Sequence, residues 1–431
     1  MNPLYLLRYH EEMNELAVDA QLDFGDEGGG GEIWSCSSCP LDAKLVVTCR
    51  NSNSDANDGA ETETALWRIP DDAIKEDDLD FYPDEDEFGD KSQDINKSMT
   101  KIAGLDLAPA TGRVTDMQWN PGCIPDSNDF DDNDTPTTGQ ITGANFLTVQ
   151  NGNREVCVTT WDVNTSTAIK MDQTILSISN ERNVMPSPPK ATWDPHNQNI
   201  CAVTVGTNIS VLDMRTPTKV INGLKSCHRF GVTDVDYNPN KPYVLSSSGQ
   251  DALVKFWDLR FTSSYDNDHH SNSASWSRHS PLRTLRGGHT HWTTSVKYNS
   301  FHDQLLLSSG TDGMVNLWRV SSISSAPLLD LGGNSAVDDM DDNDFDGDDD
   351  NPATTFDNTG MGNDEDAGDS ASVETDGGNA PDVRVTKMEM REAIYDLAWS
   401  AADPWVFVTL SFDGNVVLNH VPSKEKYKIL L

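Results

Sequence analysis

Basic residues are scarce in this chain of 431 residues. It has 31 Lys and Arg against 70 Asp and Glu, which gives a formal net charge of −39 at pH 7. Proteins that bind the nucleic acid backbone cluster Lys and Arg on one surface, because these side chains neutralise the phosphates. The sequence shows no such cluster, so we expect no nucleic acid among the partners.

Long apolar runs are also missing. No stretch approaches the ~18 consecutive apolar residues that indicate a membrane-spanning helix, so we expect no direct membrane insertion. The first residues, MNPLYLLRYHEEMNEL, contain a short apolar run that is followed at once by acidic residues. They show no cleavage pattern of small residues, and we therefore expect no secretory signal here.

The seven cysteines are too few and too scattered to predict a disulfide framework. An odd number in strand-like segments favours a reducing compartment, and the cytosol is the default. Cys36 and Cys39 form a CxxC pair, but no second pair and no histidine cluster follows at zinc spacing. We interpret the pair as two small half-buried thiols, and we expect no metal and no cofactor.

Two stretches do carry a distinctive pattern, the same four residue types in the same register. Each member of the second set lies 61 residues after its counterpart in the first. A histidine before the first strand, a hydroxyl on the second, an aspartate in the next hairpin and a tryptophan on the third describe the hydrogen-bonded tetrad of a WD repeat, where ~40–45 residues make one four-stranded blade. The two sets are His228, Ser247, Asp251, Trp257 and His289, Ser308, Asp312, Trp318.

A histidine, a serine and an aspartate also suggest a hydrolase triad. The set occurs twice and includes a tryptophan, so we interpret these residues as structural tetrads and not as an active site. No P-loop, nucleophile elbow, HExxH or pair of catalytic carboxylates stands out from the repeats. We therefore expect no catalytic residues and no enzyme activity.

Weaker copies of the same pattern surround the two complete repeats. They cover Gly31 to Pro70, Val114 to Val163, Lys190 to Arg215 and Ala393 to Pro422. Some tetrad positions carry other residues: Gly206 and Leu212 replace Asp and Trp in the third copy, and Met390 and Asn419 replace His and Trp around Asp413 in the last. Six repeats are thus visible, two of them complete.

WD propellers usually close with about seven blades, since an unpaired blade exposes an apolar face. The remaining strands must then come from the termini. Leu4 to Tyr9 and Glu15 to Phe24 supply two strands, and KYKILL at the C-terminus is predicted as an outer strand of the last blade. The prediction is an all-β, WD40-type β-propeller over residues 1–431, seven-bladed in plan with an incomplete first blade. Either residues before Met1 are missing or the propeller has a gap there.

Polar segments interrupt the repeats. Runs such as DDMDDNDFDGDDD cannot bury a core and repel themselves, so we expect disorder in them. The predicted inserts are an acidic disordered segment at 71–100, an acidic loop at 123–140, a polar loop at 263–280 and an acidic disordered linker at 331–382 before the last blade.

Several motifs resemble the WD-repeat family of the EARP and GARP complex-interacting protein. They are GEIW at Gly31, VDYNPNKPYVLSSSGQDALVKFWD at Val235, HTHWTTSVKYNSFHDQLLLSSG at His289, the following VSSISSAP, AIYDLAWSAADPWVFVTLSFDGNVVLNHVP at Ala393, and KYKILL. The chain departs from the family in its incomplete first blade and in Met390, where the family has histidine. The resemblance implies a seven-bladed propeller that binds the EARP and GARP tethering complexes.

The same resemblance implies a non-enzymatic adaptor in endosome to trans-Golgi retrieval and endosomal recycling. The expected protein is cytoplasmic, a monomeric propeller within a larger assembly, and associated with endosomes and the trans-Golgi network through its partners. Two alternatives remain open: a substrate receptor of a cullin ubiquitin ligase, suggested by WDLR at Trp257 to Arg260, and a histone or chromatin-binding propeller, suggested by the acidic inserts.

The partner surface has a candidate position. Propellers often bind partners near the residues that follow the tetrad histidine, around the central channel, where an aromatic side chain can be a hot spot. An equally good interpretation is that such residues only shield the strand below. The candidates are Trp34, Arg229, Phe230, His291, Trp292 and Tyr395.

Overall fold

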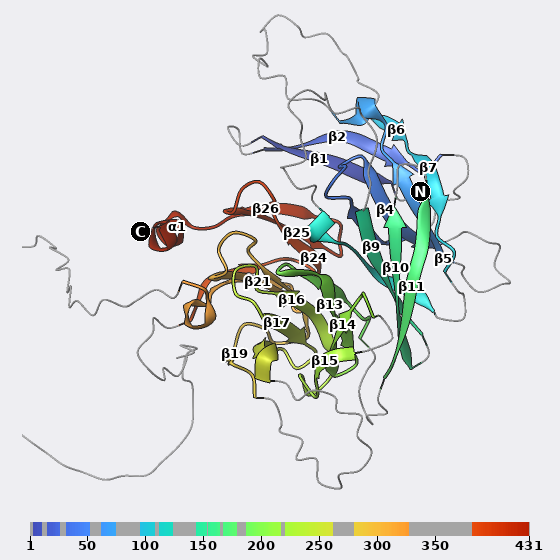
Figure 1. Cartoon of the computed structure of the whole chain (residues 1–431). Helices are drawn as coiled ribbons and strands as arrows, with labels where there is room; N and C mark the ends of the chain where they lie inside the picture. The colour runs from blue at the N-terminus through green and yellow to red at the C-terminus, as the bar shows by residue number, and fades with distance from the viewer. Residues whose placement is uncertain are drawn as a thin grey trace, which may run out of the picture.

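The described residues of the chain fold into seven β-sheets in a computed structural model (Figure 1). From the second sheet onward, the first strands of consecutive sheets contact one another in chain order, as the blades of a propeller do. The predicted all-β WD40-type propeller is thus confirmed. The structure describes residues 3–10, 15–25, 32–51, 62–74, 95–107, 112–123, 144–152, 154–163, 167–178, 187–216, 220–261, 280–326 and 382–430.

Five of these sheets have four antiparallel strands each. In chain order they are β3 (Ile33–Ser38), β4 (Leu45–Asn51), β5 (Thr62–Arg68), β7 (Thr100–Gly104); β8 (Arg113–Trp119), β9 (Ala144–Asn151), β10 (Glu155–Val163), β11 (Ala168–Ser177); β12 (Ala191–Asp194), β13 (Asn197–Val205), β14 (Asn208–Asp213), β15 (Val220–Leu224); β16 (Val232–Tyr237), β17 (Val244–Gly249), β18 (Val254–Asp258), β19 (Arg283–Leu285); and β20 (Thr293–Tyr298), β21 (Leu305–Gly310), β22 (Met314–Arg319), β23 (Val383–Glu389).

The other two sheets have three strands in the described residues. They are β1 (Leu4–His10), β2 (Glu15–Asp23), β6 (Asn96–Ser98), and β24 (Ile394–Trp399), β25 (Val406–Ser411), β26 (Val416–His420). Short 3-10 turns and one α-helix complete the described structure: η1 (Asp71–Ala73), η3 (Pro121–Cys123), η4 (Leu259–Phe261), η5 (Ser321–Ile323) and α1 (Ser423–Leu430).

The second strands of the two complete repeats show how the sequence encodes this arrangement. β17 reads VLSSSG and β21 reads LLLSSG, and every residue of both strands is buried. A strand covered on both faces requires apolar or small hydrogen-bonded side chains instead of an alternating pattern. β16 and β20 are less completely covered, because the second and fifth residues of each strand are only half-buried.

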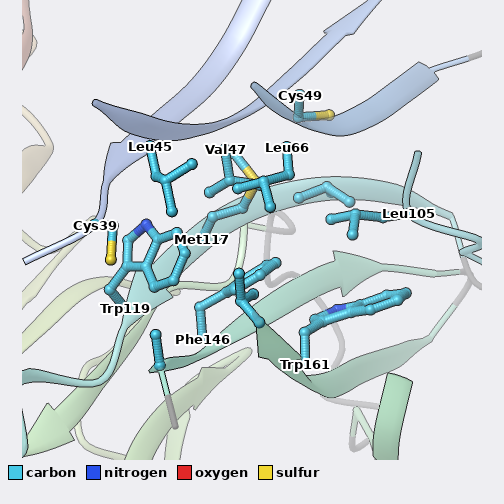
Figure 2. Packing of buried hydrophobic residues seen from close by; sticks show 13 residues of the cluster. Cys39, Leu45, Val47, Cys49, Leu66, Leu105, Met117, Trp119, Phe146 and Trp161 are labelled. Atoms are coloured by element: carbon cyan, nitrogen blue, oxygen red, sulfur yellow. The ribbon is translucent and has the colours of Figure 1, made fainter. Parts of the chain in front are cut away.

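The apolar core lies between neighbouring sheets. Figure 2 shows the seam between the β3–β7 and β8–β11 sheets, where Leu45, Val47 and Leu66 meet Phe146 and Trp161. The Phe146 ring packs 4.9 Å from Trp119 and 6.3 Å from Trp161, measured between centroids. Burying these side chains fully is worth about 1.5–3 kcal/mol each. The stability of each blade therefore depends on its neighbours.

The first blade has three strands in the described residues, one more than the two predicted from the sequence. β1 and β2 form a hairpin whose third strand, β6, arrives in parallel orientation from far along the chain. Ala20 and Leu22 on β2 pack against Trp67 of the next sheet. On the other side, the Tyr9 hydroxyl lies 3.2 Å from His420 Nε2 on β26. The hairpin thus sits between the last blade and the β3–β7 sheet.

The predicted inserts fall mostly outside the described residues. In the 71–100 segment, the described ends carry η1, the strand β6 and the first residue of β7. Almost all of the 123–140, 263–280 and 331–382 segments lies outside the described ranges.

The strand predicted for KYKILL is wrong, because Lys426 to Leu430 belong to helix α1, while Leu431 lies outside the described residues. The carbonyl of Pro422 accepts hydrogen bonds from the backbone N–H groups of Glu425 and Lys426, which starts the helix. Ile429 then packs against the apolar cluster around Phe407. A short apolar run fits either a strand or a helix, and the contacts of its side chains decide between them.

Glu425 holds α1 to the sheet β20–β23. Its Oε2 accepts a hydrogen bond of 2.7 Å from Arg319 Nη1, and both side chains are only 9% exposed. Its Oε1 accepts a 2.7 Å bond from Lys428, which is 41% exposed. The Arg319 pair is thus buried, while the Lys428 pair faces solvent.

We predict that Glu425→Ala lowers the free energy of unfolding by about 3–5 kcal/mol, because it leaves the Arg319 guanidinium buried without its partner. Lys428→Ala is the matched control, and its cost should stay below about 1 kcal/mol. Urea unfolding of both variants checks this. Equal costs would show that Glu425 does not act through Arg319.

Candidate partner-binding face

The structure brings the four residues of the first tetrad together. His228 Nδ1 lies 2.7 Å from Asp251 Oδ1, and His228 Nε2 lies 2.8 Å from Ser247 Oγ. The Trp257 indole N–H donates to the same Ser247 oxygen at 2.9 Å. Asp251 Oδ2 accepts the backbone N–H of Arg229 at 3.1 Å. The tetrad therefore joins β17 and β18 to the segment that enters β16 and holds that segment in place.

The second tetrad has the same geometry one blade further on. His289 lies 3.2 Å from Asp312 and 2.8 Å from the Ser308 hydroxyl, to which the Trp318 indole donates at 2.9 Å. Asp312 Oδ2 accepts the backbone N–H of Thr290 at 2.8 Å. Both serines are fully buried, so neither hydroxyl is open to a substrate.

Burial and hydrogen bonding together set the charge states in the first tetrad. Burial lowers the pKa of His228, against the opposing effect of Asp251. Burial would also raise the pKa of Asp251, but its hydrogen bonds to His228 and to the backbone lower it to about 2. The first tetrad thus contains a neutral imidazole beside an ionised carboxylate. All its hydrogen bonds are satisfied when Ser247 donates to Nε2 and Nδ1–H donates to Asp251.

Other blades retain only part of the tetrad. The Trp161 indole donates to Thr148 at 3.1 Å, which reproduces the tryptophan–hydroxyl bond. In the last blade the amide of Asn419 lies 3.5 Å from the Thr409 hydroxyl in the same two positions. Leu212, in the tryptophan position of its blade, is fully buried in an apolar cluster. Packing between blades thus replaces the missing polar contacts there.

The tetrads place the candidate residues at one end of the inner strands. Arg229 and Phe230 precede β16, His291 and Trp292 precede β20, and Tyr395 lies near the start of β24. The Arg229 guanidinium lies 5.3 Å from the Phe230 ring, and the rings of His291 and Trp292 stack at 5.1 Å. These two pairs come from adjacent blades.

Trp34 and Tyr395 meet where the ring of blades closes. The Tyr395 hydroxyl donates to the Trp34 carbonyl at 2.9 Å, which joins β24 to β3. The Arg113 guanidinium carbon lies 3.8 Å from the centroid of the Trp34 ring, a cation–π contact. Tyr395 is 42% exposed, so its ring remains available to a partner.

Sequence reasoning missed Phe412 and Arg113. The Phe412 ring lies 5.1 Å from Tyr395 in an edge-on arrangement and is 64% exposed. An aromatic residue directly before the hairpin aspartate, here Asp413, was the available signal for it. Arg113 gave no local signal, because its partner Trp34 lies far away in the sequence. We call Trp34, Arg113, Tyr395 and Phe412 the closure patch.

The CxxC residues lie on and just after β3. Cys36 is exposed and Cys39 is buried, and burial raises the pKa of the Cys39 thiol. Within the described ranges, no group of three or more His, Cys, Asp or Glu side chains is arranged to hold a metal ion. In the same part of the chain, no helix has the length and apolar character needed to cross a membrane.

We predict that Trp257→Ala and Trp318→Ala each lower the free energy of unfolding by about 3–5 kcal/mol, since each removes a buried ring and leaves a hydroxyl without its donor. Trp292→Ala removes a partly exposed indole outside the tetrads and should cost much less. Thermal melts of the three variants compare them. A negligible shift of the melting temperature in both tetrad variants would contradict the assignment of these tryptophans to tetrads.

Acid should weaken the first tetrad in a defined window. The folded pKa of His228 lies below its ordinary value, so the unfolded chain binds the proton first and stability falls as pH drops below about 6.5. The contribution of Asp251 is lost only at lower pH, below about 4. We predict that His228→Asn shows a shallower loss of stability between pH 7 and pH 5 than the unmodified chain in urea titrations. Equal slopes would contradict this.

The comparisons with known proteins point to one family. The model described as EIPR1 beta-propeller matches residues 147–318. EARP and GARP complex-interacting protein 1 from Homo sapiens is 28% identical over 434 residues, which covers 100% of this chain and 90% of that protein.

Two further matches extend the comparison. EARP-interacting protein 1 from Caenorhabditis elegans is 30% identical over 257 residues, covering 59% of this chain and 56% of that protein. Among solved structures, the C-terminal WD40 domain of Sif2 aligns with a TM-score of 0.48 and 12% identity over 98% of this chain and 76% of that one. The sequence relatives and the family model agree with the resemblance seen in the motifs: the chain is similar to the EIPR1 β-propeller family.

Proposed function

We propose that this propeller is a non-enzymatic adaptor that binds the EARP and GARP tethering complexes. One observation carries the proposal: the full length of the chain aligns with 90% of a human relative whose name states that interaction. A second relative, from Caenorhabditis elegans, is named for EARP alone. The proposed role is in endosome to trans-Golgi retrieval and endosomal recycling.

The closure patch is the proposed contact surface. It combines two exposed aromatic rings, Tyr395 and Phe412, with the stacked pair of Trp34 and Arg113. Aromatic and arginine side chains dominate the binding energy of protein interfaces, because they bury large areas with little loss of conformational freedom. The hydrogen bond from Tyr395 to the Trp34 carbonyl holds the patch in place before binding.

The other candidates extend this surface around the same end of the channel. Phe230 is 37% exposed, and Arg229 and His291 are exposed as well. They follow the tetrad histidines in segments that Asp251 and Asp312 hold by accepting the backbone N–H groups of Arg229 and Thr290. A rigid surface binds with a smaller loss of conformational entropy than a flexible one. The two tetrads thus support binding indirectly, by positioning residues that touch the partner.

The burial of the serine–histidine pairs in the two tetrads supports the non-enzymatic assignment. A nucleophile needs access to its substrate, whereas the Ser247 and Ser308 hydroxyls are fully buried and accept an indole N–H. The geometry suits a structural network better than acyl transfer.

The WDLR motif has a local explanation in the structure. Arg260 Nη2 donates to Asp258 Oδ2 at 2.5 Å, and Arg215 pairs with Asp213 in the same way at 2.7 Å in the preceding blade. An aspartate–arginine pair at this turn is thus a repeated feature of the blades. The affinity purification described below tests the two alternatives, because a cullin adaptor or histones would be recovered with the chain.

Membrane association should depend on the tethering complexes. A chain with a net charge of −39 is repelled by the anionic cytoplasmic leaflet, which favours recruitment through a protein. The proposed location is the cytosolic side of endosomes and the trans-Golgi network.

We predict that affinity purification of the tagged chain recovers tethering-complex subunits and that the double variant Tyr395→Ala, Phe412→Ala loses them. Truncating a hot-spot aromatic typically costs about 2 kcal/mol or more of binding free energy. Tyr427→Ala on α1 is the matched control, because this tyrosine is 65% exposed and lies outside the patch. Melting curves of the variants verify folding.

Recovery of a cullin adaptor or of histones in place of tether subunits would overturn the proposed function. If the double variant and Tyr427→Ala recover equal amounts of the tethering-complex subunits, the contact surface lies outside the closure patch.

A further inference from the structure

A cavity of about 480 Å³ opens at the opposite end of the inner strands from the closure patch. Its walls come from the last residues of β8, β12, β16 and β20 and from the turns that follow them, so four consecutive blades contribute. The polar residues facing it are Gln118, Thr192, Asp236 and Ser300. Neither the tetrads nor the candidate face involves these positions.

The walls are built by a motif that recurs at the end of three inner strands: an aromatic residue, a polar residue and a proline. The copies are Trp119-Asn120-Pro121, Trp193-Asp194-Pro195 and Tyr237-Asn238-Pro239, and all three prolines line the cavity. The Trp193 indole donates to the Gln118 carbonyl at 3.0 Å, and the Asn120 amide donates to the Gln198 carbonyl at 2.8 Å. These bonds cross between blades and hold the cavity open without a ligand.

Asp236 supplies the charge of the cavity. Its Oδ2 accepts the backbone N–H of Tyr298 at 2.8 Å, while Oδ1 has a longer contact of 3.4 Å with the Thr192 hydroxyl. The nearby ammonium of Lys297 lies 3.1 Å from a different carboxylate, that of Asp234. One oxygen of Asp236 is therefore only weakly engaged.

The channel behind the cavity adds to the negative potential. Asp116, Asp234 and Asp396 act on the two lysines there, Lys190 and Lys297. With Asp236 this makes four aspartates against two lysines. Burial raises the pKa of Asp236 to about 6, against the opposing effects of Lys297 and of the hydrogen bond from Tyr298 N–H.

We propose that this cavity binds a basic side chain, arginine or lysine, from an extended segment of a partner protein. The cationic head group pairs with Asp236 Oδ1, and the prolines at the rim pack against the aliphatic stem. Long basic side chains combine an apolar stem with a charged end, which matches a cavity lined by prolines and aromatic rings that also contains one carboxylate. An anionic or a wholly apolar ligand would leave the carboxylate uncompensated.

This site does not depend on the closure patch, and a partner could occupy both ends of the channel. The net charge of −39 raises the local concentration of basic segments near the whole surface. Specific binding in the cavity must therefore be separated from this general attraction. Changing one carboxylate among 70 acidic residues has little effect on the general attraction but removes the charge of the cavity.

The test measures fluorescence anisotropy of short labelled peptides of alanine and proline with one central arginine, lysine or alanine, added to the purified full chain at physiological salt. We expect the arginine and lysine peptides to bind and the alanine peptide not to bind. Asp236→Asn should weaken binding about tenfold or more, because the cation loses its buried partner. Asp71→Asn makes the same charge change on a side chain that is 86% exposed and should have no effect.

A second variant does not touch the buried network. Ser300→Trp places a large ring on an exposed position at the rim and should block the cavity while leaving the melting temperature unchanged. Loss of binding in both Asp236→Asn and Ser300→Trp supports the proposal. The proposal is overturned if no basic peptide binds, or if binding is equal in Asp236→Asn, Ser300→Trp and Asp71→Asn, since only surface attraction would then remain.

Discussion

The seam between neighbouring blades is the contact on which the rest of the structure depends. A single sheet of this protein cannot bury its two apolar faces, and β17 and β21 have no exposed residue once their neighbours are in place. Hydrogen bonds repeat along the seam near the channel. Asn120, Asn238 and Asn299 each donate an amide to the following blade, at distances of 2.8, 3.0 and 2.6 Å. Apolar burial supplies the stability, and these bonds fix the angle at which the sheets meet.

The first and last sheets must contact each other to complete the ring of blades. Residues near the two ends of the chain make these contacts. The Tyr395 hydroxyl reaches the Trp34 carbonyl near the channel, and the Tyr9 hydroxyl reaches His420 further out. β6 completes the first sheet from a distant part of the sequence. Helix α1 packs against the last two blades through Ile429 and the Arg319–Glu425 pair. The closure is therefore made by residues that no single repeat contains.

Because the inner strands are parallel in space, the propeller has two chemically different ends. At the entry of the strands, tetrads hold segments that carry exposed aromatic and basic residues, such as Phe230 and Arg229. At the exit, proline-containing turns surround an acidic cavity around Asp236. One end thus has an exposed surface of aromatic and basic residues, and the other end has a cavity. Two chemically different ends suit an adaptor that contacts more than one segment of an assembly. Such binding requires no conformational change of the propeller.

The sequence by itself determined the repeats, since a tetrad requires its four residue types at a fixed spacing within one blade. His228 and His289 could be assigned for that reason, and the strands up to Asp23 followed from alternation and from the need to fill the ring. The face that carries Tyr395 and Trp34 followed from the same register. KYKILL could not be assigned, because an apolar run of this length fits both a helix and a strand until Ile429 meets its neighbours. Only the tertiary structure decided the position of β6, the addition of Arg113 and Phe412 to the closure patch, and the acidic cavity. Each of these joins residues from different blades, and the local pattern of one blade carries no information on which distant residue will complete its surface.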